Sequence, residues 1–286
     1  MNTNYNKRRV SAIALLFLAL FMLAPVCSAS AQSVNDSYGI WATFEASKKI
    51  NKKFKVVGDV ELRTYDFVNN IERAAVGAKI EYKAFKWLKA NVGYQFHYKH
   101  NPKEIKMKYD DIVVDMDGEE FVNYNIDHDY WVIRNRFYAT ISGEYKVGRF
   151  EFGLRKRLQY THTGSATANE TKYRYSLGDD VLSTDDNHWT NETKSELKEA
   201  KHNLTLRSRL SVKYDIPNCK VNPFASVELY TRFDKWKGCD KLRYRIGASY
   251  KINKKNSISL YYLYQQVNDD DEPGGHAIGL EYSIDL

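Results

Sequence analysis

The sequence predicts an all-β chain that closes into a transmembrane antiparallel β-barrel of 10 to 12 strands, with short periplasmic turns and long extracellular loops. Three observations support this prediction. Apolar and polar residues alternate over many segments of ten or more residues, short lysine-bearing turns alternate with long acidic segments, and Arg-x-Arg pairs recur on the face opposite the apolar row. Because residues i and i+2 of a strand share a face, a barrel would turn the apolar row to lipid and the arginines to its lumen.

The first 31 residues have the pattern of a cleaved signal peptide. A basic start at 7–9 precedes an apolar run at 13–23, and an A-x-A cleavage site at 29–31 follows. The run is too short to cross a bilayer as a helix. We therefore expect 1–31 to be removed and 32–286 to form a single outer-membrane β-barrel domain.

Composition supports one β domain and argues against nucleic acid as a partner. The chain has 5 prolines but 22 tyrosines, 13 phenylalanines and 5 tryptophans, and no linker rich in Pro, Gly or Ser divides it. Its mean hydropathy is −0.59, as in a barrel whose alternating strands form no long apolar run. Without the signal peptide, 40 basic and 36 acidic residues remain, a surplus too small to indicate nucleic-acid binding. A secreted β-sandwich is the alternative fold, but it would not need such long strands.

Four strands are predicted in the first third of the mature chain, at 38–49, 54–67, 73–83 and 88–100. The last of these alternates most regularly. Twelve alternating residues at about 3.3 Å each, tilted, are long enough to cross the apolar layer of a bilayer.

An Arg-x-Arg hairpin follows at 130–161, with a short turn at Lys146-Val147-Gly148-Arg149. Long polar segments flank it at 101–129 and 163–200. Within the first of these, Asp117-Gly118 predicts a hairpin turn. We interpret both segments as loops.

Five further strands complete the chain, at 203–214, 223–233, 241–251, 257–266 and 276–286. The pattern thus contains eleven strand signals. Single-chain bacterial barrels normally have an even number of strands, so we expect the true count to be 10 or 12.

These strands resemble bacterial outer-membrane proteins of domain-of-unknown-function family 2490 (DUF2490). The resemblance rests on the strand around Trp41 and Glu45, the strand with Glu61 and Arg63, the Arg-x-Arg strands and the tyrosine-rich closing strands. It spans nearly the whole mature chain. It implies a barrel in the bacterial outer membrane and no particular activity.

Charged residues on the inward rows are the candidate functional residues. Arginine bonds carboxylates bidentately and stays charged, so these rows predict cross-strand salt bridges that fill a narrow barrel. Alternatively, because arginines outnumber acids, they predict a constriction that selects small anionic solutes. The predicted lumen-lining residues are Arg63, Arg134, Arg136, Arg155, Arg157, Arg207, Arg209, Arg243, Arg245, Asp59, Glu61, Glu81, Glu144, Glu151, Glu228 and Glu281, together with Lys79 and Arg232.

The sequence offers little support for catalysis or metal binding. Glu144 and Glu151 are expected to face each other beside the tight turn, where they could share a proton, but a neighbouring Lys or Arg would neutralise them more simply. No catalytic residue, metal site or cofactor is predicted. The histidines gather toward the expected outer rim without metal-ligand spacing, at His97, His100, His128, His162, His202 and His276.

Cys219 and Cys239 are expected at opposite ends of the strand 223–233. At the rise of a strand they would lie on the order of 30 Å apart, whereas a disulfide needs Cα atoms within about 7 Å. We therefore predict no bridge between them.

The sequence thus favours a non-enzymatic, porin-like barrel in the bacterial cell outer membrane, either a narrow channel for small anionic solutes or a plugged structural barrel. The alternative from another class is an outer-membrane lipid hydrolase that uses a rim histidine, although no Gly-x-Ser-x-Gly motif is present. Expected partners are outer-membrane lipid and lipopolysaccharide and the barrel assembly machinery. The protein is expected to be a monomer.

Overall fold

The computed structural model describes residues 37–114, 120–176, 189–233, 239–267 and 274–286. The predicted signal peptide at 1–31 and the predicted turn at Asp117-Gly118 lie outside these ranges. All regular secondary structure in the described part is β-strand. No helix there is long and apolar enough to cross a membrane.

The chain forms two compact units. The first comprises the described part of Met1–His97 with Asn135–His162 and His202–Leu286, and the second comprises Tyr98–Arg134 and Thr163–Lys201. The chain therefore passes between the units four times, and no single cut separates them. The prediction of one domain at 32–286 stays a prediction.

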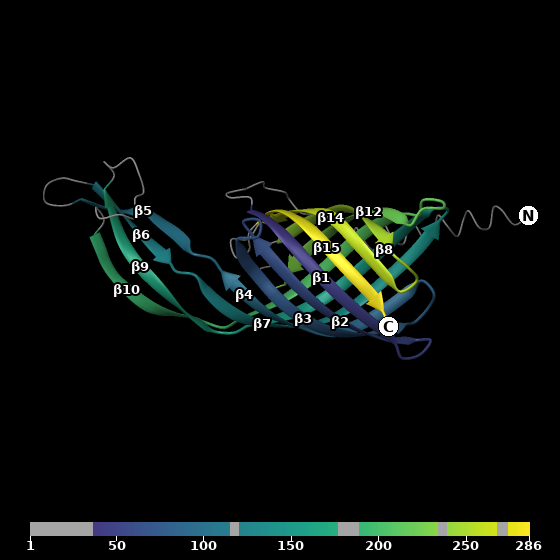
Figure 1. Ribbon diagram of the computed structural model, residues 1–286. Helices are drawn as coiled ribbons and strands as arrows, with labels where there is room; N and C mark the ends of the chain where they lie inside the picture. Colours follow the sequence, from purple (N-terminus) through teal and green to yellow (C-terminus); the bar gives the residue numbers. More distant parts are fainter. Residues whose placement is uncertain (1–36, 115–119, 177–188, 234–238, 268–273) are drawn as a thin grey trace, which may run out of the picture. The chain divides into compact units, whose positions relative to one another are not determined.

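Eleven strands form a closed barrel in the described chain, in the order β1-β15-β14-β13-β12-β11-β8-β7-β4-β3-β2 (Figure 1). The alternation predicts all eleven, and the predicted ends differ from the observed ones by at most three residues. The all-β barrel prediction is therefore confirmed. The bounds are β1 Ser37–Lys49, β2 Phe54–Tyr65, β3 Asn70–Lys83, β4 Leu88–Asn101, β7 Tyr130–Val147, β8 Phe150–Thr163, β11 Lys201–Tyr214, β12 Val221–Arg232, β13 Lys241–Lys251, β14 Asn256–Val267 and β15 Gly275–Asp285.

The barrel closes through a parallel pair, β1 with β15, whose register runs from Ser37↔Gly275 to Ser47↔Asp285. The backbone N–H of Leu286 also donates to the carbonyl oxygen of Ser47 at 2.7 Å. The count of eleven lies within the predicted range of 10 to 12, but the expectation of an even number was wrong. When strands alternate in direction, the first and last of an odd number point the same way, so only a parallel pair can close the barrel.

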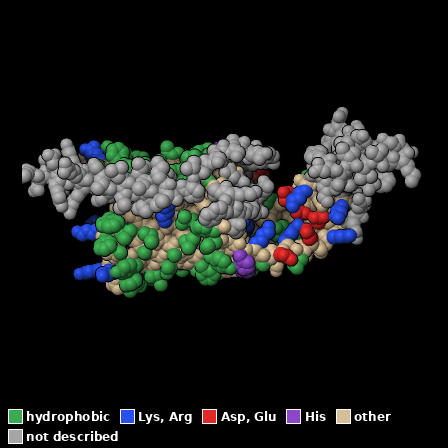
Figure 2. Space-filling model, turned by 180° about the vertical axis from the view of Figure 1, so that it is seen from behind, with side chains coloured by type: hydrophobic (Ala, Val, Ile, Leu, Met, Phe, Trp, Pro, Cys, Tyr) green, Lys and Arg blue, Asp and Glu red, His purple; other side chains and the backbone are tan. Residues whose placement is uncertain are grey.

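The outward face of the barrel is apolar (Figure 2). Val60 on β2 and its register partner Val76 on β3 are 53% and 52% exposed, and similar residues cover the middle of the other strands. Aromatic rings gather near both ends of the strands. Near the short turns the pairs are Phe54–Tyr82, Phe85–Trp87, Phe44–Tyr282 and Phe150–Tyr214, and near the opposite ends they are Tyr38–His276, Tyr160–His202 and Tyr262–His276.

Short turns join the barrel strands at one end, at 50–53, 84–87, 148–149, 215–220 and 252–255. In the tightest of them Gly148 has a φ of 58°, a conformation that costs glycine nothing because it has no Cβ. At the other end, the connections 102–129 and 164–200 are long, as predicted.

These two long connections are not irregular loops, because they contain the four strands of the second unit. The strands are β5 Glu104–Val114, β6 Glu120–Asp127, β9 Ala166–Ser176 and β10 Trp189–Lys198, in the order β10-β9-β6-β5. Every pair in this sheet is antiparallel. The interpretation of the segments as loops missed these strands. A short period-2 signal exists at 104–109 in β5 and at 122–127 in β6, where apolar and polar residues alternate, whereas β9 and β10 are mostly polar and give none.

Candidate functional site

The lumen is organised around Glu228, an inward-facing residue of β12 that is 1% exposed. Its carboxylate accepts hydrogen bonds from Arg155 at 2.6 Å, Arg207 at 3.0 Å and Arg209 at 3.1 Å. The hydroxyl of Tyr230 donates to it at 3.1 Å. The alternation of β8, β11 and β12 brings these groups together, because each arginine points to the same side as the carboxylate.

A row of side-chain contacts crosses the lumen from this carboxylate. Arg243 of β13 lies 3.9 Å from Glu228 and stacks over Trp41 of β1 at 4.8 Å from the ring centroid. Arg63 of β2 also lies over the same indole, 3.5 Å from the centroid. We call Arg63, Trp41, Arg243, Glu228 and Arg155 the crossing layer. It connects β2 to β8, which are separated in the barrel by β3, β4 and β7.

A second carboxylate supports the crossing layer on the β2 side. Glu61 accepts hydrogen bonds from Arg63 at 2.8 Å and from Arg73 at 3.0 Å. His97 is 1% exposed in the same part of the barrel. Buried guanidinium groups with carboxylate partners and aromatic faces avoid the large cost of an unpaired buried charge.

A cavity of about 400 Å³ occupies the other part of the lumen, in the halves of the strands that end at the short turns. Arg155, Arg157, Arg209 and Arg245 line it. Arg157 donates to Thr140 at 3.1 Å, and Arg245 lies over the ring of Tyr261 at 5.1 Å. We call this cavity the arginine chamber.

The remaining predicted lumen residues lie in several places. Glu81 and Glu281 line the arginine chamber. Asp59 accepts a hydrogen bond from Gln95 at 2.8 Å. Arg136 donates to the hydroxyl of Thr161 at 3.4 Å. Arg134 lies on the barrel strand β7, in the part of that strand that groups with the second unit.

Glu144 and Glu151 line the chamber near the tight turn, but each carboxylate has a lysine partner. Lys89 lies 3.1 Å from Glu144, and Lys146 lies 3.2 Å from Glu151. Each lysine neutralises its glutamate, which is the alternative to acid-base chemistry that the sequence analysis gives for these two carboxylates.

Sequence reasoning missed the aromatic part of the lumen. Trp41, Tyr230 and Tyr261 are 5–6% exposed and face inward under arginines. A signal existed, because each has the inward parity of its strand, as Tyr230 does two residues after Glu228. Large aromatic rings on the polar row indicate a filled lumen.

The histidines make local pairs. In the barrel unit, His202 accepts or donates a hydrogen bond with Tyr160 at 2.6 Å, and its Nδ1 lies 3.3 Å from Nδ1 of His162. In the second unit, His100 lies 3.1 Å from Asp129 and His128 lies 2.8 Å from the hydroxyl of Thr171. The lipid-hydrolase alternative stays a prediction.

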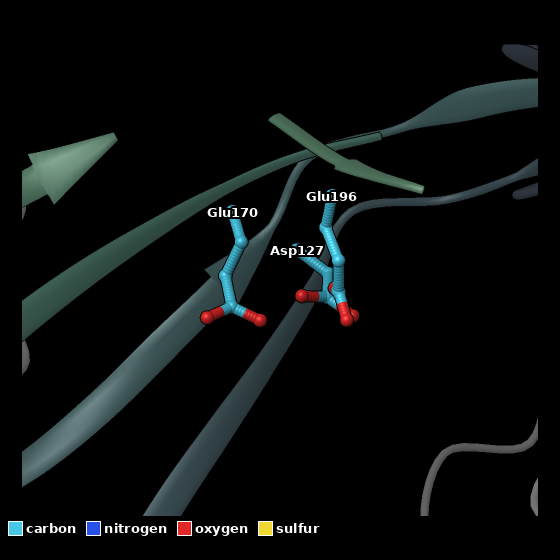
Figure 3. Close-up of side chains that lie close together, drawn as sticks. All are labelled: Asp127, Glu170 and Glu196. Atoms are coloured by element: carbon cyan, nitrogen blue, oxygen red, sulfur yellow. The ribbon is translucent and has the colours of Figure 1, made fainter. Parts of the chain in front are cut away.

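Three carboxylates of the second unit lie together, with ligand atoms within 4.8 Å of one another: Asp127 of β6, Glu170 of β9 and Glu196 of β10 (Figure 3). Lysines already neutralise this cluster. Lys106 lies 2.9 Å and Lys198 3.4 Å from Asp127. Burial acts to raise the pKa of Asp127, but the hydrogen bond from Lys106 and the charges of both lysines have a larger, opposite effect. The pKa of Asp127 therefore lies below its ordinary value of 3.8.

Cys219 is a free, exposed cysteine. It therefore forms no bridge with Cys239, and the prediction that these two residues are not joined is confirmed.

A family model described as "Protein of unknown function (DUF2490)" matches residues 38–274. The chain belongs to this family. The match begins in β1 and ends directly before β15, so it spans the crossing layer, the second unit and every residue lining the arginine chamber except Glu281 of this DUF2490 protein. The resemblance to family DUF2490 is confirmed, whereas the family description names no activity and no location. No curated protein matches the chain.

Among solved structures, the DUF2490 chain is similar to the translocator domain of the autotransporter NalP from Neisseria meningitidis, with 10% identity and a TM-score of 0.36, over 77% of this chain and 72% of that one. It is also similar to the CymD monoaromatic hydrocarbon channel, with 11% identity and a TM-score of 0.30, over 79% of this chain and 82% of that one. At these values neither likeness carries an argument about function.

Proposed function

We propose that this DUF2490 protein is an integral β-barrel of the bacterial outer membrane whose lumen is closed by the crossing layer, and that its role is non-enzymatic. The outward face supports the membrane location. Residues such as Val60, Ile80 and Ile246 are more than half exposed, and burying apolar surface is worth roughly 25 cal/mol per Å². A soluble monomer rarely leaves so large an apolar band in water.

The two sets of aromatic pairs add to this argument. Outer-membrane barrels carry an apolar band flanked by aromatic girdles at both interfaces, and here rings gather near both ends of the strands. The short turns expose lysines, among them Lys52, Lys86 and Lys254. We therefore propose that the short turns lie on the periplasmic side and that lipid and lipopolysaccharide contact the outward face. We further propose that the barrel assembly machinery folds the protein into the membrane.

The observation that carries the closed lumen is the crossing layer itself. Its side chains form a continuous row of contacts from β2 to β8, in the order Arg63, Trp41, Arg243, Glu228 and Arg155. Each of the first four is less than 10% exposed. Side chains that are paired and stacked in this way leave no continuous aqueous path among them.

A narrow anion channel is the second candidate. The observation that favours it is the surplus of arginine: Arg155, Arg207, Arg209 and Arg243 share one carboxylate, Glu228. Rings of arginine favour anions in pores. Conduction would require the crossing layer to move aside.

Planar-bilayer recording distinguishes the two candidates. The mature protein, refolded in detergent and checked by heat-modifiable mobility, is expected to insert without discrete conductance steps. The double variant Trp41→Ala with Arg243→Ala removes the centre of the crossing layer and is expected to conduct. Glu144→Gln, outside the layer, is the matched control and is expected to stay silent. Discrete steps in the wild-type protein would overturn the closed-lumen proposal and support the channel.

A further inference from the structure

We infer that the arginine chamber is a binding site for a small polyhydroxylated oxyanion, a sugar phosphate or a sugar acid, that enters from the short-turn end. The inference deepens the proposed function, because a closed lumen makes the chamber a pocket with one entrance. It stands on three features of the chamber: surplus positive charge, unpartnered polar atoms and a set of hydroxyl groups.

Six basic residues line the chamber, namely Arg155, Arg157, Arg209, Arg245, Lys79 and Lys213, against the four glutamates Glu81, Glu144, Glu151 and Glu281. The surplus therefore rests on the four arginines. Among the described contacts of these arginines, only Arg155 and Arg209 reach a carboxylate, and they share it, since both donate to Glu228. An unbalanced guanidinium group away from bulk water is costly unless an anion compensates it. The chamber is therefore suited to a negatively charged occupant.

The unpartnered atoms point to hydrogen bonding with that occupant. The Nε atoms of Arg155, Arg209 and Arg245 are buried and have no hydrogen-bond partner, and neither has the amide oxygen of Asn91, which also lines the chamber. Most buried polar groups in folded proteins are bonded. Guanidinium groups bond the oxygens of phosphate and carboxylate in a planar, two-pronged manner.

The neutral lining specifies more than a bare inorganic ion. Serine side chains contribute hydroxyl groups from five strands, and Phe224 and Tyr261 add aromatic faces. Hydroxyl and amide groups bond sugar hydroxyls, which phosphate or chloride alone lacks. A volume of about 400 Å³ is within the usual range for small-molecule pockets. The lining serines are Ser142, Ser211, Ser226, Ser249 and Ser259.

Isothermal titration of the folded full-length mature protein in detergent tests the inference, with glucose 6-phosphate and gluconate as probes. Glucose controls for the hydroxyl groups alone, and inorganic phosphate controls for the charge alone. We expect at least one of the first two probes to bind at least tenfold more tightly than both glucose and phosphate. If glucose 6-phosphate binds and gluconate does not, the phosphate source is selected, and the reverse result selects the carboxylate.

Two variants locate the site. Arg245→Gln and Arg157→Gln each remove one chamber guanidinium without touching Glu228 and are expected to weaken binding at least tenfold. Arg149→Gln, which removes an exposed arginine from the turn at the same end of the barrel, is expected to leave binding unchanged. Heat-modifiable mobility confirms that each variant is folded before titration.

The inference is overturned if no probe binds, if phosphate binds as tightly as the sugar anions, or if folded Arg245→Gln and Arg157→Gln bind as the wild type does. These outcomes are separate from the conductance experiment. A conducting wild-type barrel would refute the closed lumen and leave the titration result standing. A silent barrel that binds no sugar anion would refute only the site.

Discussion

The guanidinium group of Arg155 on β8 lies 2.6 Å from the carboxylate of Glu228 on β12, across the intervening strand β11. The pair therefore ties together strands that share no backbone hydrogen bonds. Glu228 also bonds Arg207 and Arg209, so one carboxylate balances several guanidinium groups. Loss of this one negative charge should cost more than loss of any single arginine.

Glu228→Gln is expected to destabilise the barrel by about 3 to 5 kcal/mol, because it leaves buried guanidinium groups without their carboxylate. Urea unfolding in lipid vesicles, followed by tryptophan fluorescence, measures the change. Glu144→Gln is the matched control: its partner Lys89 is at the exposed end of the barrel, and such a pair is worth about 1 kcal/mol or less. Equal effects of the two substitutions would contradict a central role for Glu228.

Gly279→Ala is expected to destabilise the barrel by about 1 to 3 kcal/mol, because overpacking strains a filled core. A Cβ at residue 279 would lie 2.0 Å from the ring of Tyr261, its register partner on β14. Replacement of Tyr261 by Leu should relieve the clash, so a double-mutant cycle should give a coupling of about 1 kcal/mol. Gly58→Ala is the control, since the nearest atom to its Cβ is 3.8 Å away. No coupling between 261 and 279 would contradict this packing.

These contacts mark the limit of what the sequence could predict. Period-2 alternation identifies each barrel strand and the side to which Arg155 and Glu228 point, because parity is a local property. It cannot show that the two residues meet across β11, since that depends on the register of two further strand pairs. Trp41 has a visible inward parity, but its place between Arg63 and Arg243 requires the closure of β1 on β15. Strands β5 and β6 carry only short alternating stretches within a long polar segment, and β9 and β10 are mostly polar, so the interpretation of both segments as loops missed all four.

Acid is expected to loosen the second unit through Asp127. Its pKa lies below 3.8, because the bond from Lys106 and the charges of Lys106 and Lys198 outweigh the effect of burial. A lowered folded pKa contributes stability above the unfolded pKa, and this stability is lost as the pH falls through the folded value.

Hydrogen exchange detected by mass spectrometry, corrected for the intrinsic rate at each pH, measures this effect. Protection of β6 and β9 should decrease as the pH falls below 3.8 in the wild-type protein. Asp127→Asn cannot titrate, so its protection should be lower at neutral pH and should change less on acidification. A wild-type unit whose protection is the same at both pH values would show that the lysine pairs contribute nothing to its stability.

The parallel closure predicts a specific cross-link. Ala42 on β1 and Leu280 on β15 are register partners, so cysteines at both positions should have Cα atoms within the 4.4–6.8 Å or so that a disulfide needs. The background is Cys219→Ser, which removes the free cysteine. Under mild oxidation, Ala42→Cys with Leu280→Cys should form an intramolecular bridge, detected by a mobility shift without reductant.

Ala42→Cys with Ile284→Cys is the control pair for this closure. Ile284 is the register partner of Ala46, four residues farther along, and four residues of strand span about 13 Å. This pair should therefore stay reduced under the same conditions. A bridge in the control but not in the first pair would place β15 in another register. Failure of both pairs in a folded protein would contradict the register Ala42↔Leu280 of this parallel closure.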